Sequence, residues 1–186
     1  MLLDALPEIL LGTSNPAKEK QLRWLLEGLR LEPRAVEPLD VVEDSADIGD
    51  NAAIKALAYS AGGLAIASDG GLDVPALGAS WQAARTRRQG QAGLRRLTAG
   101  LEDRRVRWIE AVAVAEHGRL LASWTGSGTQ GVLVEEPWPE PANFWVWDIF
   151  LFPELDKTWA QLSPAQREAV DVTWMALKAH VQAFFS

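Results

Sequence analysis

Four charged side chains, far apart in the chain, are of the types that handle a polyphosphate. Lys18 and Lys55 are cations able to hold phosphate oxygens as point charges, and Glu43 and Asp69 are carboxylates able to hold a hard ion such as Mg²⁺. A bound Mg²⁺ bridges and neutralises phosphate oxygens, and a carboxylate can instead take a proton from an attacking water. The alternative for each residue alone is a solvated lysine, a solvated glutamate or a turn aspartate.

The segment around Lys18 is typical of a phosphate-holding turn. Backbone N–H groups at a helix start point outward, and the helix dipole favours an anion there. Thr13 and Ser14 add hydroxyl donors, Asn15 is a good N-cap, and Lys18 lies on the first helical turn. We therefore expect Thr13, Ser14, Asn15 and Lys18 to bind phosphate; the alternative is a plain helix cap.

The elements that must position these groups alternate between strand and helix. Residues 8–13 predict a short buried strand, and residues 16–30 predict a helix with Pro16 at its first position. A second strand is expected over residues 32–39. A second helix, capped by Asp47, is expected over residues 48–61 and carries Lys55.

Asp69 follows residues 64–68, which predict a buried strand. Because Gly70 and Gly71 come next, a turn is expected over residues 69–71, with Asp69 at the carboxyl end of the strand. Ligands of α/β sheets lie outside the carboxyl ends of strands. Glu43 belongs to an acidic loop, and the sequence predicts that it meets Asp69 at one metal site.

The second half of the chain contains a hairpin and a long terminal helix. Residues 80–100 predict a basic helix in two pieces, broken near Gly90, and residues 105–116 and 119–124 predict hairpin strands around a turn at His117 and Gly118. Residues 136–143 are proline-rich and predict a loop. The last helix begins in a capping box at Ser163 and is expected to bury one stripe, made of Val170, Trp174, Leu177, Val181 and Phe184.

Composition excludes several classes of function. The net charge is −7 without a basic tract, so no nucleic acid polymer is expected as a partner. The chain has no cysteine and only two histidines, which excludes thiolate catalysis and Cys-rich or His-rich metal sites. No apolar run is long enough to cross a membrane, and the acidic start of the chain lacks the basic region of a signal peptide. A cytoplasmic location without membrane association is expected.

Two further groups allow a functional and a structural interpretation. Arg85 belongs to a small basic cluster that could line a polyphosphate path, or form a solvated helix face. Among nine tryptophans, Trp138, Trp145 and Trp147 are close in sequence and could stack on a base. Core or dimer packing is the alternative, which we favour for most of them.

In chain order, these motifs resemble the inosine/xanthosine triphosphate pyrophosphatase family, and the similarity runs along nearly the whole chain. The family opens with Thr/Ser-x-Asn-x-x-Lys, continues with an acidic loop and Glu-Asn-Ala-x-x-Lys-Ala, and then has Asp-Asp-Ser-Gly-Leu, Leu-Gly, Ser-Ala-Arg and Lys-Thr-x-Ala-Glu-Leu. The matching positions here are residues 13–18, Glu43, residues 50–56, 68–72, 77–78, 83–85 and 157–162.

The resemblance implies an α/β fold with an elongated mixed β-sheet flanked by helices, two lobes and a central cleft, in a single domain over residues 1–186. It also implies a homodimer that hydrolyses non-canonical purine nucleoside triphosphates to monophosphate and pyrophosphate with Mg²⁺. By position, Asn15, Lys18 and Lys55 would hold phosphates, Glu43 would bind the metal, and Asp69 would be the catalytic acidic residue.

Departures from the family fall mostly at the base end of the substrate. The family's Phe-Gly-Tyr-Asp-Pro becomes residues 145–149, which keep Trp145 and Asp148 as candidates for base binding. The family's Ser-His-Arg becomes residues 171–173, where Val172 and Thr173 cannot replace the hydrogen bonds to a 6-oxo purine. At roughly 1.5–3 kcal/mol per bond to a charged group, the loss favours an altered or broadened base preference.

Two hypotheses follow from these departures. The first is a Mg²⁺-dependent nucleoside triphosphate pyrophosphatase with a changed base preference. The second is a catalytically impaired relative that acts as a nucleotide-binding or structural dimeric module, motivated by the loss at residues 171–173 and by Ser68 in place of the first aspartate of the Asp-Asp pair. The shared presence of Lys18, Glu43, Lys55 and Asp69 favours the enzyme, because a fold alone does not need that polar set.

Overall fold

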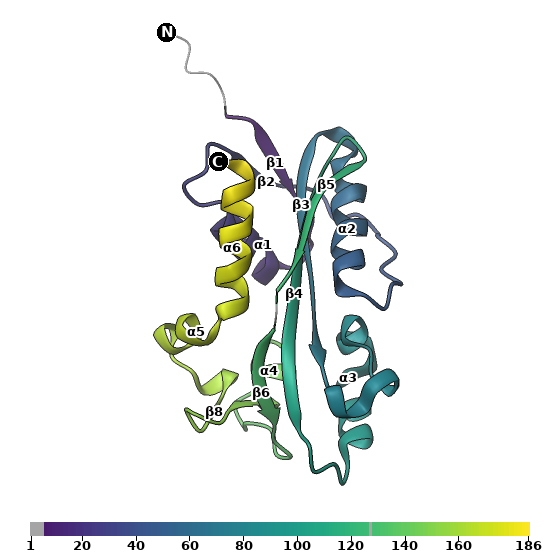
Figure 1. Cartoon of the computed structure of the whole chain (residues 1–186), viewed down its shortest axis with the longest axis vertical. Coiled ribbons are helices and arrows are strands. Elements are labelled where there is room, and N and C mark those ends of the chain that lie inside the picture. Colours follow the sequence, from purple (N-terminus) through teal and green to yellow (C-terminus); the bar gives the residue numbers. More distant parts are fainter. Residues whose placement is uncertain (1–5, 127) are drawn as a thin grey trace. The chain divides into compact units, whose positions relative to one another are not determined.

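The computed structural model describes residues 6–126 and 128–186, so the first five residues of the chain lie outside the described part. It contains a mixed sheet, and helices flank this sheet (Figure 1). The hydrogen-bonded order of the strands is β2 (Glu32–Ala35), β1 (Glu8–Leu11), β3 (Leu64–Asp73), β4 (Arg105–Glu116), β6 (Thr129–Leu133), β7 (Phe150–Phe152) and β8 (Lys157–Thr158), with β5 (Arg119–Thr125) paired to β4. The predicted α/β class with a mixed sheet is confirmed. The chain divides into two compact units, residues 1–69, 110–126 and 174–186, and residues 70–109 and 127–173.

The first unit contains the parallel part of the sheet. Strand β1 (Glu8–Leu11) pairs in parallel with β2 (Glu32–Ala35) and with β3 (Leu64–Asp73), whose first residues belong to this unit. The end of β4 (Arg105–Glu116) forms the predicted hairpin with β5 (Arg119–Thr125). Its turn puts His117 and Gly118 at positive φ, as the sequence predicts.

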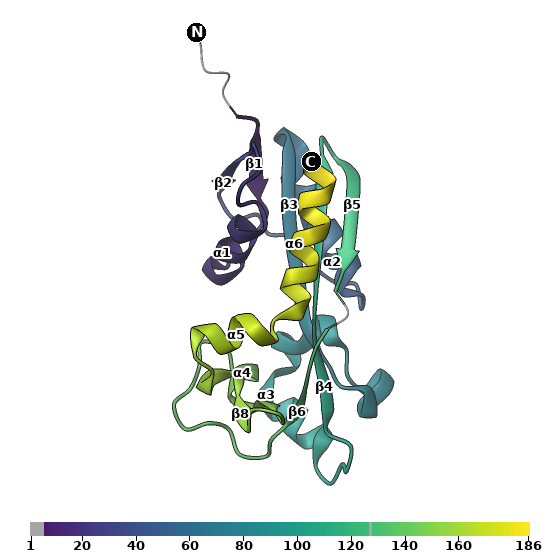
Figure 2. The ribbon, with the colours of Figure 1, turned by 60° about the vertical axis from the view of Figure 1, so that its left-hand side comes forward.

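Three helices cover this sheet. The apolar sides of α1 (Pro16–Leu25) and α6 (Val172–Phe185) share one buried core with β1, β3 and β4, and α2 (Ile48–Tyr59) packs beside β5. Figure 1 shows α6 on one side of these strands and α2 on the other, and Figure 2 shows α1 next to β1. The stripe predicted for the last helix is confirmed at Trp174, Leu177 and Val181, which are buried.

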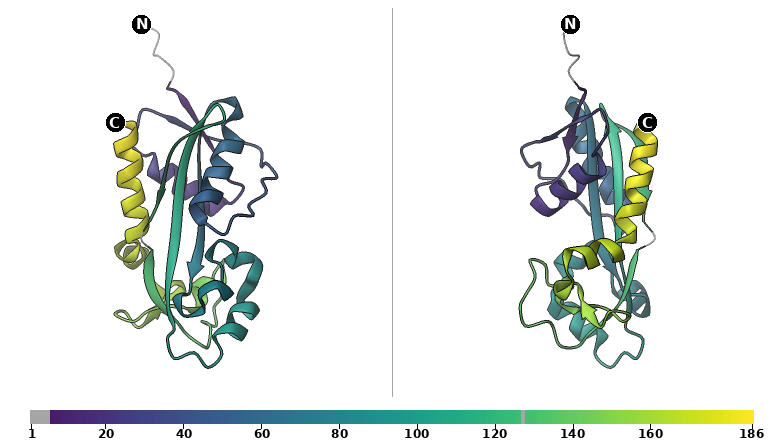
Figure 3. Two further views of the ribbon diagram at one scale, coloured as in Figure 1. Left: turned by 45° about the vertical axis from the view of Figure 1, so that its right-hand side comes forward. Right: turned by 90° about the vertical axis from the view of Figure 1, so that its left-hand side faces the viewer.

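The second unit contains residues 70–73 of β3 and residues 105–109 of β4. Strand β6 (Thr129–Leu133) pairs with the start of β4, then with β7 (Phe150–Phe152), which pairs with β8 (Lys157–Thr158). Helices α3 (Thr86–Thr98), α4 (Val146–Ile149) and α5 (Pro164–Val170) belong to it, together with short 3₁₀ turns at Pro75–Ser80, Ala83–Arg85 and Trp159–Gln161. Figure 3 shows β3 and β4 from two further sides.

Two predicted elements are wrong. Residues 69–71 are not a turn, because β3 continues through them to Asp73, so Asp69 lies within a strand instead of at its carboxyl end. The terminal helix is not continuous, because Asp171 leaves the helical conformation (φ −86°, ψ 55°) and separates α5 from α6. Phe184, predicted as core, is 39% exposed. The interruption predicted near Gly90 is confirmed, at φ 70° and ψ 168°.

Helix α2 depends on a side-chain cap. Asp47 accepts a hydrogen bond from the backbone N–H of Asp50 at 2.9 Å, which satisfies one of the free donors of the first turn. We expect Asp47→Ala to lower the free energy of unfolding by about 1 kcal/mol. Urea unfolding measures this, with the exposed Asp40→Ala as the control. Equal stability of the two variants would contradict the prediction.

Candidate active site

The start of α1 is built as the sequence predicts. Asn15 caps the helix by accepting from the N–H of Ala17 at 2.9 Å, and the hydroxyl oxygen of Thr13 accepts from the N–H of Asn15 at 3.1 Å. These two contacts hold the turn after β1 in one conformation. Ser14 is exposed and no hydrogen bond of its hydroxyl is described. The hydroxyl protons of Thr13 and Ser14 remain able to donate to an anion.

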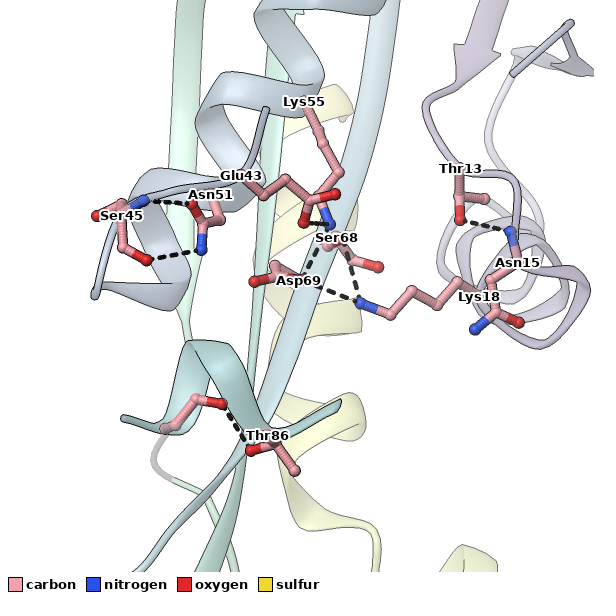
Figure 4. Close-up of polar contacts among 11 residues, drawn as sticks. Thr13, Asn15, Lys18, Glu43, Ser45, Asn51, Lys55, Ser68, Asp69 and Thr86 are labelled. Carbon is pink, nitrogen blue, oxygen red and sulfur yellow. Dashed lines mark hydrogen bonds and ion pairs between the residues drawn. The ribbon is translucent and has the colours of Figure 1, made fainter. Parts of the chain in front are cut away.

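Lys18 reaches from this helix to strand β3. Its ammonium nitrogen lies 3.5 Å from Asp69 Oδ1 and 3.4 Å from the carbonyl oxygen of Ser68 (Figure 4). Strands β1 and β3 are parallel neighbours, so the turn that leaves β1 and the polar residues of β3 lie together. Lys18 and Asp69, two residues that the resemblance assigns to the site, therefore lie together although they are 51 positions apart in the sequence.

Lys55 connects both carboxylates. Its ammonium nitrogen lies 2.9 Å from Asp69 Oδ1 and 2.7 Å from Glu43 Oε2, and Figure 4 shows the three side chains converging from α2, β3 and the acidic loop. The side chains of Lys55 and Asp69 are only 11% and 10% exposed, whereas that of Glu43 is 38% exposed. Low solvent exposure strengthens the ion pair between Lys55 and Asp69 relative to surface pairs, whereas the pair between Lys55 and Glu43 is more open to solvent.

The loop that carries Glu43 is fastened by a side chain that sequence reasoning did not single out. Asn51 is 1% exposed; its Oδ1 accepts from the N–H of Ser45 at 3.2 Å, and its Nδ2 donates to the carbonyl of Ser45 at 3.1 Å. This two-bond clamp ties the loop to helix α2, which also carries Lys55. The match to the Glu-Asn-Ala motif was the signal that could have identified it.

Burial and charge oppose each other at Lys55. Burial disfavours the ammonium, but the carboxylates of Asp69 and Glu43 outweigh it, and the pKa of Lys55 lies above its usual 10.5. The stabilisation that Lys55 provides is therefore complete below pH 10.5 and is lost as the pH rises through the folded-state value.

A pH series measures this loss. Relative to Lys55→Met, the free energy of unfolding of the wild type is expected to decline above pH 10.5. Urea unfolding from about pH 9 upward gives both curves. Lys20→Met, at an exposed position on α1, controls for the loss of one lysine. A difference between wild type and Lys55→Met that stays constant through this range would contradict the assigned interaction.

Glu43 and Asp69 are the residues that could hold a divalent ion. Asp69 Oδ2 is buried and has no hydrogen-bond partner, so this carboxylate oxygen is available to a ligand such as a metal ion. No group of three acidic or histidine side chains suitable for a metal occurs within residues 6–126 and 128–186. A two-carboxylate site fits Mg²⁺, which takes its remaining ligands from water and substrate phosphates.

The other predicted residues belong to the second unit. Asp148 is buried, and its Oδ1 accepts from the N–H of Ala142 at 2.7 Å, so in this structure its carboxylate holds the proline-rich loop. Trp145 is half-buried and lies 5.7 Å from the ring of Phe144. Arg85 is half-buried in a short 3₁₀ turn. The roles predicted for these residues in binding base or polyphosphate stay predictions.

The residues that replace the family's Ser-His-Arg also lie at the start of α6. Val172 is 56% exposed, whereas Thr173 is buried and its hydroxyl lies 3.2 Å from the hydroxyl of Thr129. Neither side chain carries a charged donor. The charged donors that the resemblance predicts at this position are therefore absent from Val172 and Thr173.

Fold and site define an α/β protein with a cluster of two lysines and two carboxylates. The sequence profile of the Ham1 family matches residues 9–183, so this chain belongs to that family. The expected family resemblance is confirmed. No helix among the described residues is long and apolar enough to span a membrane.

Similar proteins cover nearly the whole chain. A protein of Gloeobacter violaceus named dITP/XTP pyrophosphatase is 36% identical over 168 residues, covering 86% of this chain and 85% of its own. A protein of the same name from Yersinia pseudotuberculosis is 33% identical over 193 residues, covering 95% and 97%. The structure of a HAM1 protein from Coxiella burnetii has a TM-score of 0.80 at 23% identity, over 96% of this chain and 98% of that one, which supports the fold.

Proposed function

We propose that this protein hydrolyses nucleoside triphosphates to nucleoside monophosphate and pyrophosphate, with Mg²⁺ as cofactor. The observation that carries the proposal is the convergence of Lys18, Lys55, Glu43 and Asp69 in one cluster of the first unit. The name dITP/XTP pyrophosphatase, borne by relatives that match along most of their length, supports this reaction class.

The proposed reaction assigns a role to each residue. Lys18 and Lys55 hold phosphate oxygens, and Glu43 and Asp69 hold Mg²⁺, which supplies charge neutralisation when bound. A water oxygen forms a bond to the α-phosphorus while the bond from that phosphorus to the bridging oxygen breaks. Asp69 takes the proton of the water, and pyrophosphate leaves with both electrons of the broken bond.

The proposed base preference departs from that of the relatives. Because Val172 and Thr173 offer no charged donor, ITP and XTP lose the contacts that would distinguish them from other triphosphates. Each missing bond to a charged donor is worth roughly 1.5–3 kcal/mol. We therefore infer a broadened or altered base preference. The homodimer, the two-lobed cleft and the cytoplasmic location stay predictions.

A second candidate is a nucleotide-binding member without turnover. Ser68 favours it, because a fully buried hydroxyl stands where the family has a second carboxylate, and its Oγ has no hydrogen-bond partner. The two candidates differ in turnover and share nucleotide binding.

Pyrophosphate release separates these candidates. Purified protein is incubated with Mg²⁺ and a panel of ITP, XTP, the canonical triphosphates and modified pyrimidine triphosphates, with Asp69→Asn alongside. Turnover of several bases at comparable kcat/KM is the expected result. Thermal shift with the same panel measures nucleotide binding. Stabilisation by a triphosphate without any pyrophosphate release would favour the nucleotide-binding candidate over the enzyme. A strong preference for ITP and XTP would contradict the altered base preference.

A further inference from the structure

The ammonium of Lys55 lies on the same two carboxylates that the proposed function gives to the metal. It contacts Glu43 at 2.7 Å and Asp69 at 2.9 Å, so one cation already links the two acidic side chains. Lys18 differs, because its described contacts are with Asp69, at 3.5 Å, and with the carbonyl of Ser68. Of these two lysines, Lys55 is the one placed where a bridging cation belongs.

The charges of the cluster are balanced in the protein alone. Two ammonium groups face two carboxylates, because Ser68 supplies no charge at the position next to Asp69. A divalent ion entering by itself would add two positive charges beside Lys55 and Asp69, whose side chains are only 11% and 10% exposed, and this is unfavourable. A divalent ion entering with a polyphosphate brings the compensating negative charge.

We propose that Lys55 occupies the divalent-cation position in the free protein and transfers to the polyphosphate when metal and nucleotide enter together. The inference rests on the proposed function and names the order of events at its site. Its consequence is a reciprocal coupling: nucleotide tightens metal binding, and metal tightens nucleotide binding, by the same factor.

The coupling follows from the alternative partners of Lys55. A metal that binds alone between Glu43 and Asp69 takes the place of the ammonium and leaves it without a carboxylate in a poorly solvated position. With a polyphosphate present, phosphate oxygens replace the lost carboxylates. The free protein is thus protected from binding divalent ions that carry no substrate.

Mn²⁺ binding to the nucleotide-free protein, followed by electron paramagnetic resonance, tests the proposal without any turnover. We expect Lys55→Met to bind Mn²⁺ at least about tenfold more tightly than the wild type, within the usual range of coupling between sites. Lys18→Met should gain less, since Lys18 does not bridge the carboxylates, and exposed Lys20→Met should match the wild type. Unchanged or weaker Mn²⁺ binding by Lys55→Met would overturn the proposal.

A second variant and a second measurement guard against misfolding. Lys55→Gln keeps a polar side chain and should also gain Mn²⁺ affinity, with circular dichroism confirming the fold. In wild-type protein with ¹⁵N-labelled lysine, the Lys55 side-chain signal, assigned by its absence from Lys55→Gln, should move with Mg²⁺ plus pyrophosphate and stay in place with Mg²⁺ alone. Movement with Mg²⁺ alone would overturn the proposal, whereas failure of the proposed function would appear separately, as absent pyrophosphate release by the wild type.

Discussion

Replacing Asp69 by asparagine is expected to lower kcat for pyrophosphate release by about 10²–10⁴-fold, the usual range for loss of a general base. Asparagine has nearly the same shape but carries no charge and cannot take the proton of the attacking water. The substitution also removes one of the two carboxylates that could hold Mg²⁺. Loss of the base acts on the chemical step and lowers kcat, whereas loss of the metal-holding carboxylate also weakens nucleotide binding through the metal, so KM should rise as well.

The fold should survive this substitution better than the activity does. Asp69 Oδ1 accepts contacts from both Lys18 and Lys55, and an asparagine oxygen can still accept in the same position. Removing one charge nevertheless leaves two ammonium groups with Glu43 alone. Some loss of stability is therefore expected, and thermal unfolding of the variant must be measured beside its activity.

A carboxylate on the same strand provides the matched control. Asp73 also lies in β3 but forms an ion pair with Arg107, outside the cluster. Asp73→Asn should keep kcat within about threefold of the wild type, as for a residue that does not contact the reacting groups. Equal losses in Asp69→Asn and Asp73→Asn would show that the strand, and not the Asp69 carboxylate, is responsible. Full activity of folded Asp69→Asn would exclude its catalytic role.

The elements that could be predicted from sequence are those in which local signals and burial agree. The apolar segment of β1, the Asn15 cap of α1 and the Asp47 cap of α2 each place a strand or helix start correctly. The turn at His117 and Gly118 could also be predicted from local sequence, because both residues have positive φ and glycine favours that conformation. Helix ends were predicted less well, and α1 ends at Leu25 instead of extending to residue 30.

The wrong turn at residues 69–71 shows where local reasoning fails. Adjacent glycines normally indicate a turn, but here Gly71 lies within a continuous strand, at a position where Ala83 leaves no room for a Cβ. The reason lies in residues more than ten positions further along the chain, around Ala83. Sequence spacing gives no access to such a contact.

The residues of the site could be predicted from the sequence, but the distances and contacts between them could not. Spacing alone says nothing about Lys18 and Asp69 lying 3.5 Å apart; this requires β1 and β3 to be parallel neighbours. The resemblance supplied the set because its motifs occur in a fixed order. It did not supply the bridge from Lys55 to both carboxylates or the clamp by Asn51, which depend on the fold of the acidic loop.

Gly71→Ala is expected to have the largest effect on folding. A Cβ at this position would overlap the carbonyl oxygen of Ala83 and lie 2.5 Å from its carbonyl carbon. That carbonyl cannot move freely, because it accepts from the hydroxyl of Thr86 at 2.7 Å, and the same Thr86 oxygen accepts from the N–H of Leu72 at 2.8 Å. Relief of the clash must therefore break contacts on both sides of the added methyl group.

We expect Gly71→Ala to lower the free energy of unfolding by about 3 kcal/mol or more, which is at or beyond the upper end of the range for overpacked cores. Because a domain is stable by only about 5–15 kcal/mol, such a loss is a large part of the total. Urea unfolding measures it, and pyrophosphate release should fall with the folded fraction.

Gly93→Ala is the matched control, since Gly93 lies in α3 of the same unit with nothing within 4 Å of an added Cβ. Alanine should stabilise a helix there by about 0.5–1 kcal/mol. The two glycine-to-alanine substitutions are therefore expected to change the free energy of unfolding in opposite directions. If Gly71→Ala were as stable as the wild type, the close approach of β3 to Ala83 could not be the reason why the strand carries a glycine at this position.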